Sequence, residues 1–264
     1  MLIKSTFFCL ALVLAAALAA CGGQDQKEET KEATVESAEE STEESTAQSA
    51  STSPEPTPDP RLSDLAYLRA QPPSLESEIA IGNLFLNQGE LDSALVYYRK
   101  AADRDPESAA AWNFVGICLG RMDRIEEAEA AYIKAIDADA FYVKTHVNLG
   151  NIYFRQNLLD KALQAYLVAV AIDSTDAIAW YNLGLAHEKA KDVGGAIHAH
   201  VKATECDPMN ADPWERLGWI YFDKKLYKAA RNRWSEAVDL DPNREDLKDN
   251  IQRLLDYAES TGTG

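Results

Sequence analysis

The sequence predicts an all-α solenoid, and the main observation behind this prediction is a repeat of 34 residues. One glycine recurs at this step through five units, and two alanine series keep the same spacing. The glycines are Gly82, Gly116, Gly150, Gly184 and Gly218, and the alanine series begin at Ala94 and Ala101. Chance would place glycine at five chosen positions on the order of one time in a million. A fixed period of this length is typical of repeat proteins, in which each unit buries its apolar face against the next.

Apolar residues within each unit follow a helical period, which predicts amphipathic helices. Aligned on the glycine, the units are 75–108, 109–142, 143–176, 177–210 and 211–244. Glycine at the eighth place and alanine at the twentieth allow two helices of a unit to approach closely, because neither carries a bulky side chain. Proline ends the second helix of units one, four and five. Ala140 and Ser174 replace that proline in units two and three, so we expect less sharply turned junctions there.

The last unit closely resembles the tetratricopeptide repeat. It carries the residues of that motif at the corresponding places: Trp214, Leu217, Gly218, Tyr221, Ala230, Trp234, Ala237 and Pro242. The resemblance extends over all five units. It implies pairs of antiparallel helices that stack into a right-handed superhelix, with the first helix of each unit lining a concave groove.

Both ends of the solenoid are predicted to have covers. Residues 245–264 read as a capping helix and tail, in which Glu245 and Asp246 favour the helix dipole in the first turn. An apolar stripe on this helix would face unit five: Leu247, Ile251, Leu254, Leu255 and Ala258. At the other end, residues 61–74 are predicted to form a lead-in helix that Pro72 and Pro73 interrupt.

The first 20 residues resemble a bacterial lipoprotein signal peptide. Their apolar run follows Lys4 and is too short for an ordinary transmembrane helix. It ends in Leu-Ala-Ala before Cys21, which resembles a lipobox, where the signal is cleaved before a cysteine that receives lipid. A plain secretory signal and an uncleaved anchor are the alternatives. Gly22 in place of Asp resembles the outer-membrane sorting pattern of diderm bacteria, and the orientation toward periplasm or cell surface stays open.

Residues 21–60 are predicted to be a lipidated cysteine followed by a disordered tether. The segment has eleven acidic residues against Lys27 and Lys31 and no aromatic residue, so it lacks the apolar area that folding requires. The whole chain has a formal charge of −17 and no basic stripe, which argues against nucleic acid as a partner. Anionic lipid should repel this charge, so membrane affinity would come from lipid on Cys21.

No motif in the sequence indicates an enzyme or a cofactor. It has neither a glycine-rich phosphate loop nor a GxSxG motif, and Lys191 stands where a zinc-protease helix needs its second histidine. We therefore predict no catalytic residue, no metal and no cofactor. A hydrolase or a metal-binding protein that uses His187 and His200 is the enzyme-class alternative, although both residues occupy packing places of unit four.

The resemblance places partner-binding residues on the first helices, mainly in units three to five. The candidates are Asn148, Asn151, Tyr181, Asn182, Leu185, Arg216, Trp219 and Phe222. Amides can pair with both the donor and the acceptor of an extended peptide backbone, and aromatic side chains can act as anchors. Lys144, Arg121, Arg155 and Lys189 should make the middle of the groove basic, whereas Asp212, Glu215 and Asp223 should make its far end acidic.

These observations predict a lipid-anchored protein–protein interaction scaffold, or adaptor, of the bacterial cell envelope, with a partner segment in the concave groove. A pilotin-like assembly factor for a pilus or secretion complex is the alternative, and a displayed homo-oligomer is a further one. Co-chaperones of the family clamp a terminal carboxylate with lysines and asparagines. Val147 and Asp212 stand where two of those lysines are needed, so we do not expect that clamp.

Overall fold

The computed structural model describes residues 65–261, which contain twelve helices and no strand. The helices are α2 (Leu65–Ala70), α3 (Leu75–Asn87), α4 (Leu91–Arg104), α5 (Ala109–Arg121), α6 (Ile125–Ala138), α7 (Val143–Arg155), α8 (Leu159–Ile172), α9 (Ala177–Lys189), α10 (Val193–Cys206), α11 (Ala211–Asp223), α12 (Tyr227–Leu240) and α13 (Glu245–Thr261). The predicted signal peptide, Cys21 and the tether lie outside the described residues. Within 65–261, no helix combines the length and apolar character needed to cross a bilayer.

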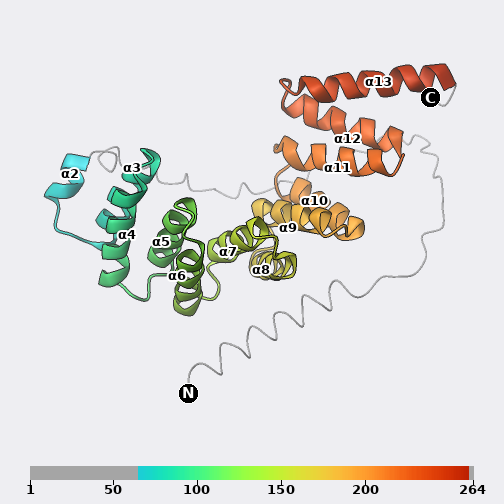
Figure 1. Ribbon diagram of the computed structural model, residues 1–264. Helices are drawn as coiled ribbons and strands as arrows, with labels where there is room; N and C mark the ends of the chain where they lie inside the picture. Colours follow the sequence, from blue (N-terminus) through green and yellow to red (C-terminus); the bar gives the residue numbers. More distant parts are fainter. Residues whose placement is uncertain (1–64, 262–264) are drawn as a thin grey trace, which may run out of the picture.

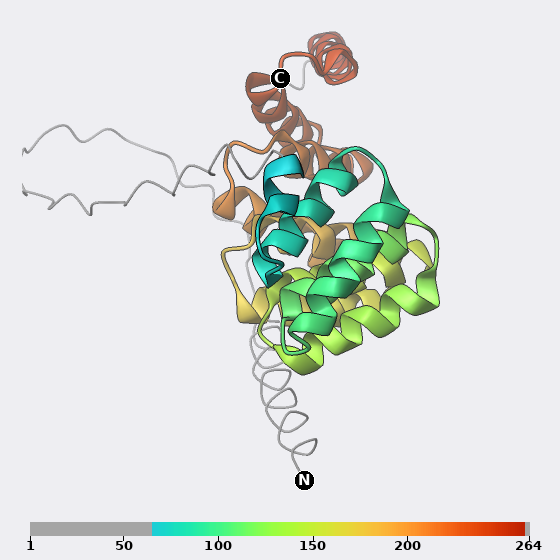
Figure 2. The same ribbon diagram turned by 90° about the vertical axis from the view of Figure 1, so that its left-hand side faces the viewer.

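Ten of the helices form five pairs that follow one another in a curved row (Figure 1). Each pair falls within one 34-residue unit, with a first helix of 13 residues and a second helix of 14 residues. The first helices are α3, α5, α7, α9 and α11, and the second helices are α4, α6, α8, α10 and α12. Figure 2 shows the row from the end that begins with α2. The predicted all-α solenoid is confirmed.

A glycine packed against an aromatic ring sets the spacing of the two helices in every unit. A Cβ atom at Gly82 would lie 2.5 Å from the ring of Tyr98, and one at Gly150 would lie 2.5 Å from the ring of Tyr166. The remaining pairs are Gly116 with Tyr132, Gly184 with His200 and Gly218 with Trp234. The expected close approach is therefore present, and the ring at the twenty-fourth place occupies the space that the glycine leaves.

The turn between the two helices of each unit contains a residue in the left-handed region. These residues are Gly89, Asp123, Asn157, Lys191 and Lys225, with φ between 60° and 79°. Only unit one has glycine there, although side chains other than those of glycine and asparagine are strained at such φ values. The packing of the helix pair therefore imposes this turn on Lys191 and Lys225, whereas Gly89, Asp123 and Asn157 are residue types that adopt it more readily.

The junctions between units differ from our expectation for Ala140 and Ser174. The second helices of units one, two and three all end at an aspartate in extended conformation, with φ of −131° at Asp105, −146° at Asp139 and −131° at Asp173. Each aspartate accepts a hydrogen bond from the backbone N–H two residues ahead, at 2.9–3.1 Å. The prediction of less sharply turned junctions is wrong, because this aspartate turn ends the helix with or without the proline.

In units two, three and four, the side chain at the fourth place joins the first helix to the preceding junction. The indole N–H groups of Trp112 and Trp180 donate to the carbonyls of Pro106 and Ser174, at 3.0 and 2.9 Å. His146 replaces tryptophan in unit three, and its Nε2 donates to the carbonyl of Ala140 at 2.9 Å. Burial lowers the pKa of His146, so the imidazole stays neutral and keeps this donor role.

The two ends of the row are covered by helices. Leu68 of α2 is buried, and α2 is shorter than the predicted 61–74 segment, since its helix ends at Ala70. Leu247 of α13 is fully buried, and Ile251 and Leu254 pack with it against the cluster around Trp234. The C-terminal helix thus seals the last helix pair through its apolar stripe.

We expect Gly150→Leu to destabilise the protein by about 1–3 kcal/mol or more, because the new side chain would overlap the buried ring of Tyr166. Lys144→Ala is the control, since Lys144 is exposed on the same helix and makes no hydrogen bond or ion pair within residues 65–261. Chemical denaturation of both variants measures the difference. An equal loss of unfolding free energy in Gly150→Leu and Lys144→Ala would show that the glycine–ring contact does not limit the helix spacing.

Candidate functional site

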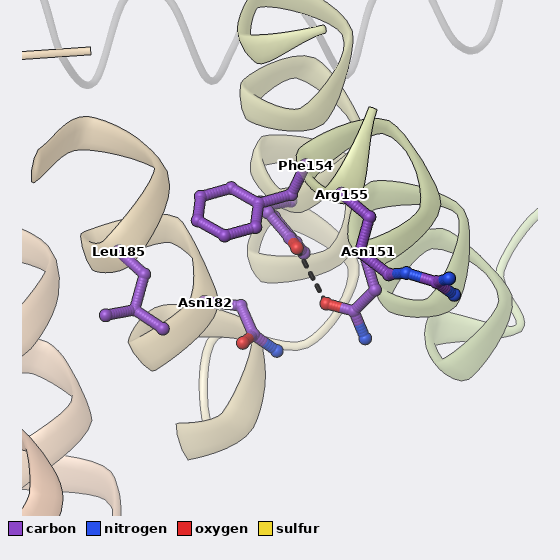
Figure 3. A pocket seen from close by; sticks show the side chains of 6 residues that line it. Asn151, Phe154, Arg155, Asn182 and Leu185 are labelled. Atoms are coloured by element: carbon purple, nitrogen blue, oxygen red, sulfur yellow. Dashed lines mark hydrogen bonds between the residues drawn. The ribbon is translucent and has the colours of Figure 1, made fainter. Parts of the chain in front are cut away.

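A pocket lies between the first helices of units three and four. Its volume is about 240 Å³, and its lining is Asn151, Phe154 and Arg155 from α7, Tyr166 from α8, and Asn182 and Leu185 from α9 (Figure 3). Three of the predicted partner-binding residues, Asn151, Asn182 and Leu185, therefore line one concave site. Sequence analysis placed Arg155 in the groove as well, but it did not identify Tyr166 as part of the lining.

The two amides of the pocket differ in what they bind. The Tyr166 hydroxyl donates to Asn151 Oδ1 at 2.6 Å, which Figure 3 shows as a dashed line. Burial raises the pKa of Tyr166, so the phenol remains a neutral donor. The side chain of Asn182 makes no hydrogen bond with any residue of the described range 65–261. Its amide thus offers an unused donor and an unused acceptor beside the apolar side chains of Phe154 and Leu185.

Two cations at the rim of the pocket reach back to the preceding unit. Arg155 donates from Nη1 to the carbonyl of Gly120 and from Nη2 to Asp123 Oδ1, both at 3.1 Å. Lys189 donates to the carbonyl of Phe154 at 3.2 Å, and its Nζ lies 4.4 Å from the centroid of the Phe154 ring. These contacts hold positive charge beside the pocket and satisfy carbonyls at the ends of α5 and α7.

Arg216 forms an ion pair within the fold, while 37% of its side chain remains exposed. Its Nε donates to Glu188 Oε1 at 2.9 Å, and its Nη2 donates to the other carboxylate oxygen. The buried His200 donates from Nε2 to Glu188 Oε1 at 2.8 Å. Burial of Glu188 raises its pKa, but the hydrogen bonds from His200 and Arg216 outweigh this effect, so the pKa lies below its usual value. Tyr181 packs beside this group, with its ring 5.6 Å from that of His200.

The histidines that suggested a metal site have separate partners. His187 Nδ1 lies 2.9 Å from Asp192 Oδ2, whereas His200 binds Glu188. Burial lowers the pKa of His187 despite the nearby carboxylate. Between residues 65 and 261, no group of three or more His, Cys, Asp or Glu side chains is arranged to hold a metal ion. The two residues are accounted for by packing and local polar contacts.

The predicted anchors Trp219 and Phe222 belong to an aromatic cluster at the C-terminal end. Trp219 meets Trp234 edge to face at 4.8 Å, and Phe222 lies 5.5 Å from the same ring. Trp219 is half-buried, and its indole N–H donates to Glu215 at 3.3 Å. Neither aromatic residue lines the pocket. Both aromatic residues therefore pack within unit five, where Phe222 also remains 36% exposed.

Asn148 also lies apart from the pocket lining. Its Nδ2 donates to Asn113 Oδ1 at 3.0 Å, and this oxygen lies 3.4 Å from the hydroxyl of Thr145. Asn113 is almost fully buried, so the three side chains form a polar connection between α5 and α7.

The far end of the first-helix row is less acidic than the sequence suggested. Arg244, the last residue before α13, binds both Asp212 and Glu215 and also lies 3.2 Å from Asp241. Only Asp223 of the three expected acids lacks an ion pair among residues 65–261. Sequence analysis missed Arg244, although its position directly before the capping helix was visible.

The comparisons with known proteins identify the repeat. Family models match residues 150–191, described as TPR repeat, and residues 79–139, described as tetratricopeptide repeat. No curated protein matches the chain.

Many solved structures resemble the fold. YrrB, titled a TPR protein with an unusual peptide-binding site, is 24% identical with a TM-score of 0.54 over 67% of this chain and 91% of that chain. PilF of Pseudomonas aeruginosa is 20% identical with a TM-score of 0.59, over 72% of this chain and 92% of that one. MamA from Desulfovibrio magneticus RS-1 is 22% identical with a TM-score of 0.56, over 64% of this chain and 96% of that chain. At these identities the likeness establishes the fold.

We expect Glu188→Gln to cost about 1–3 kcal/mol at neutral pH, because His200 and Arg216 would lose a charged acceptor. The pKa of Glu188 is lowered by folding, so its contribution is present above about pH 4.5 and is lost as the pH falls through the folded-state pKa. The difference in the free energy of unfolding between the wild type and Glu188→Gln should therefore become smaller as the pH is lowered below about 4.5. Glu205→Gln, which removes an exposed pair with Lys202, is the control and should cost under about 1 kcal/mol. A difference in unfolding free energy that does not change with pH would contradict the role of Glu188 as a charged acceptor for His200 and Arg216.

Proposed function

The chain is a tetratricopeptide-repeat protein, and we propose that it is an adaptor that binds an extended segment of another protein across α7 and α9. The observation that carries this proposal is the pocket between those helices, with the unused amide of Asn182 beside Phe154 and Leu185. Tetratricopeptide-repeat proteins are generally non-catalytic interaction scaffolds, which supports a binding role.

The size and chemistry of the pocket favour a side chain of a partner over a free small molecule. Small-molecule pockets are roughly 300–1,000 Å³ and largely enclose their ligands, whereas this one is about 240 Å³ and lies on the surface between two helices. An extended backbone presents an N–H and a C=O that the Asn182 amide can pair with simultaneously. A partner side chain then enters between Phe154 and Leu185, where burial of apolar area contributes to affinity at about 25 cal/mol per Å².

We further propose that lipid on Cys21 holds the adaptor in the bacterial envelope. The support for this comes from the sequence alone: the apolar run after Lys4 and the Leu-Ala-Ala-Cys ending. The acidic segment that follows would separate the repeats from the bilayer, since a chain of net charge −17 has no electrostatic attraction to anionic lipid. We propose the outer membrane as the site of attachment, because Gly22 stands directly after Cys21 in place of Asp, which resembles the outer-membrane sorting pattern.

A photo-crosslinking residue at position 178 should capture the partner, because Ile178 is 65% exposed and lies on the same side of α9 as Asn182 and Leu185. The same residue at position 133 is the matched control, since Ile133 is 47% exposed on the second helix α6. Adding Asn182→Ala to the position-178 protein should remove the crosslinked product. A product at position 133 that survives Asn182→Ala would place the partner on the second helices and refute the proposal.

Cys21→Ser should release the protein from membranes when the full chain is expressed in a diderm bacterium. Lipid would be its anchor, and a lipobox without cysteine cannot be acylated. Fractionation with a high-salt wash measures the outcome, and Cys118→Ser is the control because Cys118 is buried in α5. If the Cys21→Ser protein remains with washed membranes, the lipid-anchor proposal is wrong.

A further inference from the structure

We propose that the segment bound at this pocket is acidic, with carboxylates along the row of cations on α5, α7 and α9 and one aliphatic side chain in the pocket. This inference rests on the proposed function and specifies the chemistry of its partner. It concerns an internal segment rather than a chain terminus, because Val147 and Asp212 occupy the places where a terminal-carboxylate clamp needs lysine.

The first helices of units two and three reverse the charge of the chain. Neither α5 nor α7 contains an acidic residue, although the whole chain has a formal charge of −17. Together they carry three cations: Arg121, Lys144 and Arg155. In α9, Lys189 adds a fourth cation, and the one acid of this helix, Glu188, is engaged by Arg216 and His200. These three first helices therefore carry more cations than acids, although Arg155 also pairs with Asp123 of the preceding turn at 3.1 Å.

The second helices of the same three units do not share this polarity. The neighbouring α6 carries four acids, Glu126, Glu127, Glu129 and Asp137, against one lysine, Lys134, and α8 and α10 each carry one acid and one lysine. Within units two to four, the excess of positive charge is therefore confined to the first helices. An approaching acidic segment would be directed to that row by the field of the protein.

The cations form a continuous line because each sits at the same place of its unit. Arg121, Arg155 and Lys189 are the last residues of α5, α7 and α9. Arg155 and Lys189 each contact the carbonyl that precedes the last residue of the neighbouring first helix. This contact satisfies helix C-termini, and it leaves further N–H donors on both side chains for carboxylates. Arg155 also lines the pocket itself, so the charged line and the apolar site are adjacent.

Lys144 has no structural role that explains its charge. It is the second residue of α7, where a cation opposes the helix dipole, and no acid occurs in that first turn. It is exposed and forms no ion pair with any carboxylate between residues 65 and 261. An unpaired lysine at this unfavourable position is accounted for by an anionic ligand.

The test measures binding of blocked synthetic peptides to the full chain by fluorescence anisotropy. The probe alternates glutamate and serine around one central leucine, and its analogues replace either every glutamate by glutamine or the leucine by alanine. We expect the glutamine analogue to bind about tenfold more weakly, which corresponds to about 1.4 kcal/mol. Binding of the acidic peptide should weaken with added salt, since exposed pairs are screened over about 8 Å at physiological ionic strength. The alanine analogue should also bind more weakly.

Variants assign the effect to the first-helix row. Lys144→Gln should lower the affinity for the acidic peptide about threefold, which corresponds to about 0.7 kcal/mol. It should leave the affinity for the glutamine analogue unchanged. Lys228→Gln is the matched control, because Lys228 is exposed and is the second residue of the second helix α12, as Lys144 is of α7. Asn182→Ala should lower the affinities for the acidic peptide and for its glutamine analogue by the same factor, because the Asn182 amide binds the peptide backbone, which the two peptides share.

The outcomes separate this inference from the proposed function. If the glutamine analogue binds as tightly as the acidic peptide and Asn182→Ala weakens both, the groove binds peptide but the acidic partner is refuted. If no peptide binds and position 178 captures nothing, the proposed function fails. A third outcome names a different occupant: residues 28–44 of this chain contain eight glutamates. If glutamine at those eight positions strengthens peptide binding by the full chain, that segment occupies the site and a separate acidic partner is refuted.

Discussion

The contact between a glycine and an aromatic ring determines how close the two helices of each unit can come. A Cβ atom on the glycine would overlap the ring, so any larger residue there would push the pair apart. The contact recurs from Gly82 with Tyr98 to Gly218 with Trp234, which gives the five pairs similar spacing. Regular stacking of similar pairs then places α5, α7 and α9 side by side, and the pocket and the cation row both depend on that placement.

The identity of the ring decides what lies on the first-helix side of each unit. Tyr166 extends past Gly150 and ends at Asn151, so its hydroxyl becomes part of the pocket wall. In unit four His200 takes the same place and reaches Glu188, which in turn binds Arg216 of unit five. One substitution in a repeated core position thus changes the surface from an amide-lined pocket to a neutralised ion pair. Units three and four therefore differ in the polar contacts of their first helices although their backbones are alike.

The repeat keeps its geometry through backbone turns that tolerate sequence changes. An aspartate ends the second helices at Asp139 and Asp173 without the proline that follows Asp105. The left-handed turn residue varies from Gly89 to Lys225 with nearly constant φ. Because helix packing holds these turns, the exposed places of the first helices are free to carry charges and amides. Lys144, which opposes the dipole of its own helix, is one such exposed charge.

The sequence by itself determined the solenoid, because the 34-residue period, the glycines and the helical pattern are local and repeated properties. It also indicated that Asn151, Asn182 and Leu185 belong to one surface, since equal places in neighbouring units face the same side. Only the tertiary structure decided which side chains remain available. Arg216 binds Glu188, 28 residues away, and Arg244 binds Asp212, 32 residues away. Such pairings depend on how successive units stack, so no single-unit pattern reveals whether a charged side chain meets a neighbour or stays free for a partner.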